Sequence, residues 1–254
     1  MSSRTQQTIV DEQFGPRAAS YLTSAVHARG EDLDALRNIV GERPDAAALD
    51  LGCGGGHVAF LLAPRVRQVT AFDLSEAMVE VTGAEARRRG LANLVAQQGV
   101  VAQLPFADAT FDIVVSRYSA HHWQDAGAGL REAHRVLKPG GLGVFLDVVA
   151  PGRPLPDTWL QSLELLRDPS HVRNYTLEEW HGMLGAAGFG PACSRNFRVV
   201  LGFQSWIERM NTPAAHVTAI RALQACAPAE VLRYFEVQSD GTFTVDSMLL
   251  QTGN

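Results

Sequence analysis

The chain has 254 residues, of which 46% are hydrophobic and 19% are charged, so it can bury one sizeable core and a single domain over residues 1–254 is expected. Its formal net charge of −5 includes no acidic or basic block, which argues against electrostatic binding to nucleic acid or to an anionic membrane. Cys53, Cys193 and Cys226 are far apart and outside any Cys-x-x-Cys pattern, so neither a disulfide framework nor a metal site is expected.

The N-terminal sequence, MSSRTQQTIVDEQ, lacks the basic and then apolar layout of a signal peptide. No apolar run approaches the length that spans a bilayer. We therefore expect a cytoplasmic protein without a membrane span, and the oligomeric state stays open.

Short apolar runs alternate with segments of helical period along most of the chain. Residues 1–41 are expected to form an N-terminal helical cap, and residues 42–150 a cofactor-binding core. Strands are predicted at 47–51, 68–74, 94–98, 111–116 and 142–149, with a final pair near 192–200 and 243–250. Strands that alternate with helices predict an α/β fold, a doubly wound and mostly parallel sheet covered on both faces.

Two later segments, 151–188 and 204–236, read as helical insertions around the final pair of strands. In the first of them, Thr176 and Glu179 form a capping box before an apolar run. Covers over active sites are commonly drawn from such connecting segments, so the insertions are expected to cap the substrate.

A glycine-rich loop follows the first predicted strand of the core, in the sequence DLGCGGGH from Asp50 to His57. Glycines let the backbone turn sharply and approach a ligand closely, with a helix N-terminus just behind. The dinucleotide fingerprint G-x-G-x-x-G would need a glycine where the chain has His57. Asp50 would repel a pyrophosphate at this loop but would favour a cationic ligand.

The second strand ends in Asp73, 21 residues after Gly52, close to the spacing at which an acidic side chain binds both ribose hydroxyls. A ribose without a diphosphate is therefore indicated. Adenosine joined to a cationic, amino-acid-like tail satisfies both conditions, and S-adenosylmethionine is the leading candidate.

Several motifs, in order, resemble the class I S-adenosylmethionine-dependent methyltransferases, a Rossmann-like fold. They are Asp50-x-Gly52-x-Gly54-x-Gly56, Asp73, LPF at 104–106 and LREAHRVLKPGG at 130–141. The chain is especially similar to the branch with the ubiquinone/menaquinone C-methyltransferases, and FGPRAASY at 14–21 resembles that branch's motif closing over the cofactor. The resemblance covers roughly residues 12–150. A nucleotide-binding domain with another ligand is the alternative.

The resemblance, with the loop and strand ends above, predicts a set of cofactor-binding residues. They are Asp50, Gly52, Cys53, Gly54, Gly56, Asp73, Leu74, Met78, Val100, Val101, Ser116, Arg117 and Tyr21. The chain departs from many relatives in having Gly99-Val100-Val101 where they carry Gly-Asp, whose aspartate contacts the adenine amino group. The adenine would then depend on backbone atoms near Val101 and on packing against Leu74.

Two adjacent histidines follow the strand FDIVVS, in the stretch SRYSAHHW. Ligands in this fold bind beyond the carboxyl ends of the strands, so Ser116 and Arg117 are expected beside the methionine part of the cofactor. An imidazole titrates near neutrality and can take a proton from the acceptor, so His121 and His122 are catalytic candidates. Adjacent residues do not both point at one atom, and the resemblance favours His122. The alternative is that one or both histidines bond backbone groups of the next helix, with Trp123 filling the core below.

The segment DPSHVRNY, between two predicted helices, supplies the substrate-binding candidates His171, Arg173 and Tyr175. Arg173 could bind a carboxylate or phenolate through two parallel hydrogen bonds. A solvated loop is the competing interpretation.

The favoured function is methyl transfer from S-adenosylmethionine to a carbon or oxygen of a small, partly apolar molecule. The first alternative is a carboxyl O-methyltransferase acting on a free or carrier-bound acid, and an acidic carrier would need a basic docking face. A second alternative, from another class, is a non-catalytic protein that binds the cofactor or a partner. The absence of a basic stripe argues against nucleic acid as the acceptor.

Overall fold

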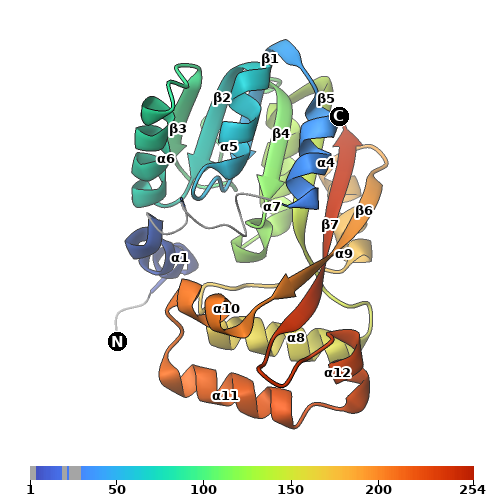
Figure 1. Ribbon diagram of the computed structural model, residues 1–254. Helices are drawn as coiled ribbons and strands as arrows, with labels where there is room; N and C mark the ends of the chain where they lie inside the picture. The colour runs from blue at the N-terminus through green and yellow to red at the C-terminus, as the bar shows by residue number, and fades with distance from the viewer. Residues whose placement is uncertain (1–3, 19–21, 23–29) are drawn as a thin grey trace.

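The computed structural model describes residues 4–18, 22 and 30–254, and its centre is a seven-stranded sheet in the order β3-β2-β1-β4-β5-β7-β6 (Figure 1). The strands are β1 (Arg43–Leu51), β2 (Val66–Asp73), β3 (Leu94–Gln98), β4 (Phe111–Arg117), β5 (Leu137–Val149), β6 (Cys193–Leu201) and β7 (Phe243–Gly253). Strand β7 runs antiparallel to both of its neighbours, and the other pairs are parallel. The predicted mostly parallel, doubly wound sheet is confirmed.

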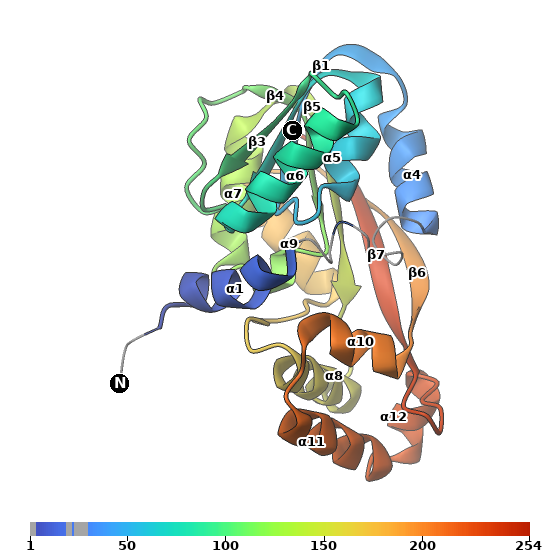
Figure 2. The same ribbon diagram turned by 60° about the vertical axis from the view of Figure 1, so that its left-hand side comes forward.

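Helices cover both faces of this sheet because each presents one apolar stripe to it. On one face, α4 (Glu31–Val40), α5 (His57–Leu62) and α6 (Glu76–Arg88) pack with the short η2 (Ala63–Arg65). On the other face lie α7 (Ala126–Val136) and α9 (Leu177–Ala187). Figure 2 shows the two helix layers on either side of the strands.

Four further helices form a separate layer beyond the carboxyl ends of the parallel strands, at the bottom of Figure 1. They are α8 (Pro154–Arg167), α10 (Phe203–Met210), α11 (Ala214–Ala225) and α12 (Ala229–Tyr234). Their own aromatic core holds them together, with Trp159 stacked on Phe235 at a ring distance of 4.7 Å and Trp206 edge-on to Phe243 at 5.0 Å. We call these four helices the cap layer.

Helix α9 differs from the expectation that residues 151–188 belong wholly to the cap. Its buried residues Trp180 and Leu184 pack on the sheet, and the indole of Trp180 lies 6.1 Å from the Phe145 ring of β5. The predicted capping box is present, with Thr176 Oγ1 accepting from Glu179 N–H and Glu179 Oε2 accepting from Thr176 N–H. The apolar face of α9 therefore completes a sheet layer, and only α8 from this segment joins the cap layer.

Helix α1 (Gln6–Phe14) and the following η1 (Gly15–Arg17) lie at the same end of the sheet as the cap layer (Figures 1 and 2). Gln6 donates a hydrogen bond of 2.6 Å to the Ser170 carbonyl, and Gln13 donates one of 3.2 Å to the Met210 carbonyl. These bonds hold α1 against the segment that follows α8 and against the C-terminal end of α10. Within the described residues, no helix has the length and apolar character needed to cross a lipid bilayer.

Candidate functional site

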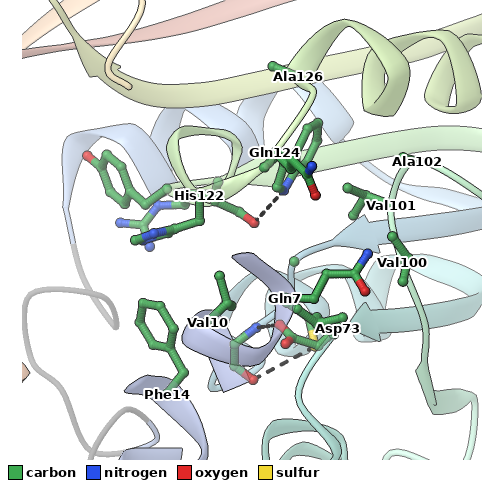
Figure 3. Close-up of a pocket in the computed structure, with 18 of the residues that line it drawn as sticks. Gln7, Val10, Phe14, Asp73, Val100, Val101, Ala102, His122, Gln124 and Ala126 are labelled. Carbon is green, nitrogen blue, oxygen red and sulfur yellow. Dashed lines mark hydrogen bonds between the residues drawn. The ribbon is translucent and has the colours of Figure 1, made fainter. Parts of the chain in front are cut away.

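A cavity of about 780 Å³ opens at the carboxyl ends of β1, β2 and β4, between the sheet and α1. The predicted cofactor residues in its wall are Asp50, Gly52, Cys53, Gly54, Asp73, Leu74, Met78, Val100, Val101 and Arg117. Figure 3 shows Val100, Val101 and Ala102 on one side of this cavity, and Phe14 and His122 on the opposite side. We call it the cofactor cavity.

The glycine loop turns tightly between β1 and α5. The backbone N–H groups of Gly52 and Cys53 both donate to the Phe72 carbonyl, and the Thr82 hydroxyl donates to the Gly54 carbonyl at 2.8 Å. Gly56, with φ of +78°, begins α5, and a Cβ atom there would lie 2.7 Å from Thr82 Cγ2. Gly56 thus shapes the turn from outside the cavity wall.

Alanine substitution should separate two roles of this loop. Gly52 has φ of +68° and a Cβ there would lie 1.8 Å from Ser119 Oγ, whereas Gly54 has φ of +49° and open space around that position. Gly52→Ala should therefore lower the free energy of unfolding by about 2–4 kcal/mol, from backbone strain plus overpacking, and Gly54→Ala by only about 1–2 kcal/mol. Urea unfolding of both variants measures this difference, and equal losses would contradict it.

Asp73, at the end of β2, lies at the mouth of the loop. Its Oδ2 accepts from Gly54 N–H at 2.8 Å and its Oδ1 from Ser75 N–H at 3.0 Å. Burial raises the pKa of Asp73 above its ordinary value, although these backbone donors oppose the shift. Because each carboxylate oxygen has two acceptor sites, both oxygens retain capacity for the hydroxyls of a ribose in the cavity.

Asp50 places a second, more deeply buried carboxylate in the same wall. Its Oδ2 accepts from Ala59 N–H at 3.0 Å, while Oδ1 has no hydrogen-bond partner among residues 4–18, 22 and 30–254. Burial, with the nearby charge of Asp73, raises the pKa of Asp50 to about 7. A buried carboxylate with an unpaired oxygen fits a ligand that carries positive charge, as the tail of S-adenosylmethionine does.

The wall at Val100 and Val101 is apolar, with Leu74, Met78 and Ala102 completing it. Gln7 of α1 and Gln124, in the turn before α7, add amide groups that the sequence analysis did not select (Figure 3). Asp125 also lines the cavity and caps α7, since its Oδ1 accepts from Ala128 N–H at 2.8 Å. An N-cap residue shortly after a strand was the available sequence signal for Asp125.

The two histidines lie in the short η3 helix (Ala120–His122) and have different partners. His121 Nδ1 lies 2.5 Å from Asp147 Oδ1; burial lowers the pKa of His121, but the Asp147 carboxylate outweighs this and raises it overall. His122 lines the cofactor cavity, and burial together with the neighbouring His121 lowers the pKa of His122 to about 4. His122 is therefore a neutral imidazole at pH 7.

A second cavity, of about 410 Å³, lies between β4, β6 and the cap layer. Its wall shares Phe14, Arg117, Tyr118 and His122 with the cofactor cavity. His121 lines only this second cavity. The two cavities therefore adjoin, with His122 at their boundary.

The three substrate-binding candidates do not lie together in one cavity wall. Tyr175 lines the cofactor cavity, but His171 and Arg173 lie outside the walls of both cavities. His171 Nε2 donates to Gln161 Oε1 at 3.0 Å, and the Arg173 guanidinium binds Asp157 and Glu179. The sequence pattern could not show that these two polar side chains are already paired within the protein.

Ser116 and Tyr21 complete the predicted set. Ser116 is buried in β4 outside both cavity walls, since successive side chains of a strand alternate in direction and Arg117 takes the cavity side. Tyr21 lies outside the described residues. No close group of three potential metal ligands occurs in the part of the chain that the structure describes.

The chain is similar in sequence and in structure to known methyltransferases. Residues 49–145 match the family model described as a methyltransferase domain. The chain is 47% identical over 199 residues to the uncharacterized protein YafE of Escherichia coli, covering 78% of this chain and 96% of that protein. It is 38% identical over 201 residues to the uncharacterized methyltransferase YcgJ of Bacillus subtilis, covering 79% of each. The crystal structure of YcgJ has a TM-score of 0.85 and covers 88% of this chain and 98% of that one.

Two further relatives have names that state an activity. A ubiquinone/menaquinone biosynthesis C-methyltransferase of Desulfotalea psychrophila is 38% identical over 157 residues, covering 57% of this chain and 60% of that protein. A malonyl-[acyl-carrier protein] O-methyltransferase of Pseudescherichia vulneris is 32% identical over 191 residues, covering 72% of each. These two relatives are named for different acceptor chemistries.

Proposed function

Because the chain belongs to the S-adenosylmethionine-dependent methyltransferases, we propose that it moves a methyl group to a carbon or hydroxyl oxygen of a small, partly apolar acceptor. The observation that carries this proposal is the pair of adjoining cavities with a neutral histidine at their boundary. The cofactor supplies an electrophilic methyl group when it is bound.

In this proposal, residues of the cofactor cavity complement each part of S-adenosylmethionine. Asp73 accepts hydrogen bonds from the ribose hydroxyls, and Asp50 favours the positive charge of the tail. Leu74, Val100 and Val101 pack against the adenine, because they present an apolar wall without a carboxylate. The other predicted site residues that line the cofactor cavity are Gly52, Cys53, Gly54, Met78, Arg117 and Tyr175.

The second cavity is the proposed acceptor site. Its apolar side chains are Phe14, Val148, Phe197, Val199, Val200, Leu201, Trp206, Met210 and Val245. A volume of about 410 Å³ lies within the range of small-molecule sites. An acceptor with a ring or short hydrocarbon body would bury apolar surface there, and α10 and β6 would cover it.

The charges of the second cavity favour a hydroxyl or carbon acceptor over a carboxylate. Arg117 forms a buried ion pair of 2.7 Å with Asp32, and Arg167 lies 3.3 Å from Glu164. Arg198 lies 3.0 Å from Asp246. A carboxylate that bound one of these three guanidinium groups would compete with the acid already paired to it, which costs binding energy. The carboxyl O-methyltransferase alternative, supported by the malonyl-[acyl-carrier protein] relative, therefore ranks second.

His122 is the proposed general base. Methyl transfer needs the acceptor atom aligned and its electron pair available, and the neutral imidazole can take the proton that the acceptor loses. The O–H or C–H bond of the acceptor breaks, its electron pair stays on the acceptor, and the proton bonds to the ring nitrogen.

Matched acceptors test this function. The purified protein would be incubated with trideuteromethyl-labelled S-adenosylmethionine and pairs of ring compounds, such as naphthol and naphthoic acid, that differ only in carrying a hydroxyl or a carboxyl group. We expect mass spectrometry to find the label on the hydroxylated compounds, and nuclear magnetic resonance to show whether oxygen or carbon carries it. Labelling of the carboxylic acids alone would favour the alternative function, and no labelling with the cofactor bound would contradict both.

A further inference from the structure

The hydrogen bonds of His122 define which of its ring nitrogens carries the proton. Nδ1 lies 3.2 Å from the Ser170 carbonyl oxygen and 3.2 Å from Ser170 Oγ. A carbonyl oxygen can only accept, so Nδ1 of the neutral ring must be the donor. Nε2 then carries a lone pair and no proton, which is the state that a general base requires.

Ser170 is itself held in place by Asp168. The Ser170 hydroxyl donates to Asp168 Oδ1 at 2.6 Å, and the Ser170 backbone N–H donates to the same oxygen at 2.9 Å. Because the hydroxyl proton points to Asp168, the oxygen of that hydroxyl can only accept from His122. Ser170 and Asp168 are both buried, so water does not compete for these bonds. The result is a chain of hydrogen bonds from Asp168 through Ser170 to His122.

The second oxygen of Asp168 faces the other nitrogen of the ring. Asp168 Oδ2 is buried, lies 4.0 Å from His122 Nε2 and has no hydrogen-bond partner among the described residues. A proton arriving at Nε2 would turn the imidazole into a cation beside this carboxylate. The attraction between the two charges would stabilise that cation in a site of low dielectric.

We propose that Ser170 and Asp168 are positioning residues, which hold His122 with the proton on Nδ1 and the lone pair on Nε2. The proposal rests on the proposed function, in which His122 accepts the proton of the acceptor. Ser170 selects the tautomer, and Asp168 orients Ser170 and stabilises the protonated ring. The arrangement resembles a base oriented by a third group through a hydrogen bond, with a serine placed between the two.

The other groups around His122 are consistent with a ring that stays neutral until it accepts a proton. The ring of His121 lies 4.2 Å away and is paired with Asp147, and the His171 ring lies 6.5 Å away.

The N-terminal helix α1 also contacts this arrangement. Phe14 of α1 contacts the His122 ring edge-on at 4.9 Å. Gln6 of α1 donates to the same Ser170 carbonyl that His122 contacts. The N-terminal helix therefore reinforces the position of Ser170.

Long-range ¹H–¹⁵N correlation spectra of the ¹⁵N-histidine-labelled protein test the proposal without any acceptor. The chain has eight histidines, and the signals of His122 are identified by their loss in His122→Gln. In the wild-type protein with S-adenosylhomocysteine bound, we expect His122 to be in the Nδ1–H form at pH 7. Ser170→Ala and Asp168→Asn should each raise the ratio of Nε2–H to Nδ1–H by roughly 3–10-fold, because one hydrogen bond that selects the tautomer is lost or weakened.

Ser162→Ala provides the control, because this serine lies on α8 with its hydroxyl bonded to the Thr158 carbonyl on the exposed side. It should leave the tautomer ratio unchanged. The proposal would be overturned if wild-type His122 were in the Nε2–H form. It would also be overturned if the ratio of Nε2–H to Nδ1–H were unchanged in both Ser170→Ala and Asp168→Asn. If only one of these two variants folds, that variant alone decides. If the proposed function were wrong, the labelling experiment would show no methyl transfer, but the tautomer ratios would still change as expected.

Discussion

Asp73→Asn should weaken the binding of S-adenosylhomocysteine by about 100-fold or more. The carboxylate is the proposed acceptor for both ribose hydroxyls, and hydrogen bonds to a charged group contribute about 1.5–3 kcal/mol each. In the variant, one oxygen becomes an NH2 group, which also faces a backbone donor, Gly54 N–H or Ser75 N–H. A loss of about 3 kcal/mol corresponds to about 100-fold in the dissociation constant, which calorimetric titration measures directly.

Asp34→Asn is the matched control for this titration. Asp34 lies on α4, with its side chain 66% exposed, so the substitution removes the same charge outside the walls of both cavities. It should leave the affinity unchanged within a factor of about two, since exposed ion pairs contribute little. A fully folded Asp73→Asn protein that binds S-adenosylhomocysteine as tightly as the wild type would exclude the ribose contact.

His122→Gln should lower kcat by about 10²–10⁴-fold with the acceptor identified by isotope labelling, because a glutamine side chain cannot accept and retain a proton. The affinity for S-adenosylhomocysteine should change little, since the cofactor contacts are assigned to other residues. The pH profile adds an independent readout. Because the pKa of His122 is lowered to about 4, wild-type His122 stays unprotonated from pH 7 down to about 5. Measured with saturating cofactor, so that titration of Asp50 does not limit binding, kcat of the wild-type protein should fall only as the pH approaches 4. With a catalytic histidine of ordinary pKa, kcat would already fall near pH 6.5.

His181→Gln, on the exposed side of α9, controls for a general effect of replacing a histidine. It should retain wild-type kcat. If His122→Gln retained full activity, alignment of the acceptor alone would sustain methyl transfer, and the base assignment would be wrong. A wild-type rate that already declines near pH 6.5 would assign the titrating group to another residue.

Much of the fold could be predicted from local patterns in the sequence. The apolar runs at 47–51 and 111–116 are buried strands, and the glycines of DLGCGGGH form a tight turn with positive φ at Gly52, Gly54 and Gly56. Such features depend on neighbours in the chain, because periodicity, turn chemistry and helix caps act over a few residues. Local patterns could not show that α9 packs on the sheet, because an apolar helix face suits either a cap layer or a sheet.

Local sequence patterns were enough to predict the strands, the glycine turn and the positions of Asp50 and Asp73 at strand ends, since parallel strands bring their carboxyl ends to one edge. The hydrogen-bond partners of His122, in contrast, depend on how distant segments pack together. Asp168 and Ser170 are separated from His122 by more than forty residues and reach it because α8 packs into the cap layer. The same packing pairs His171 with Gln161 and Arg173 with Asp157. Contacts of this kind depend on how the layers pack, and no periodicity in the sequence encodes which polar groups meet.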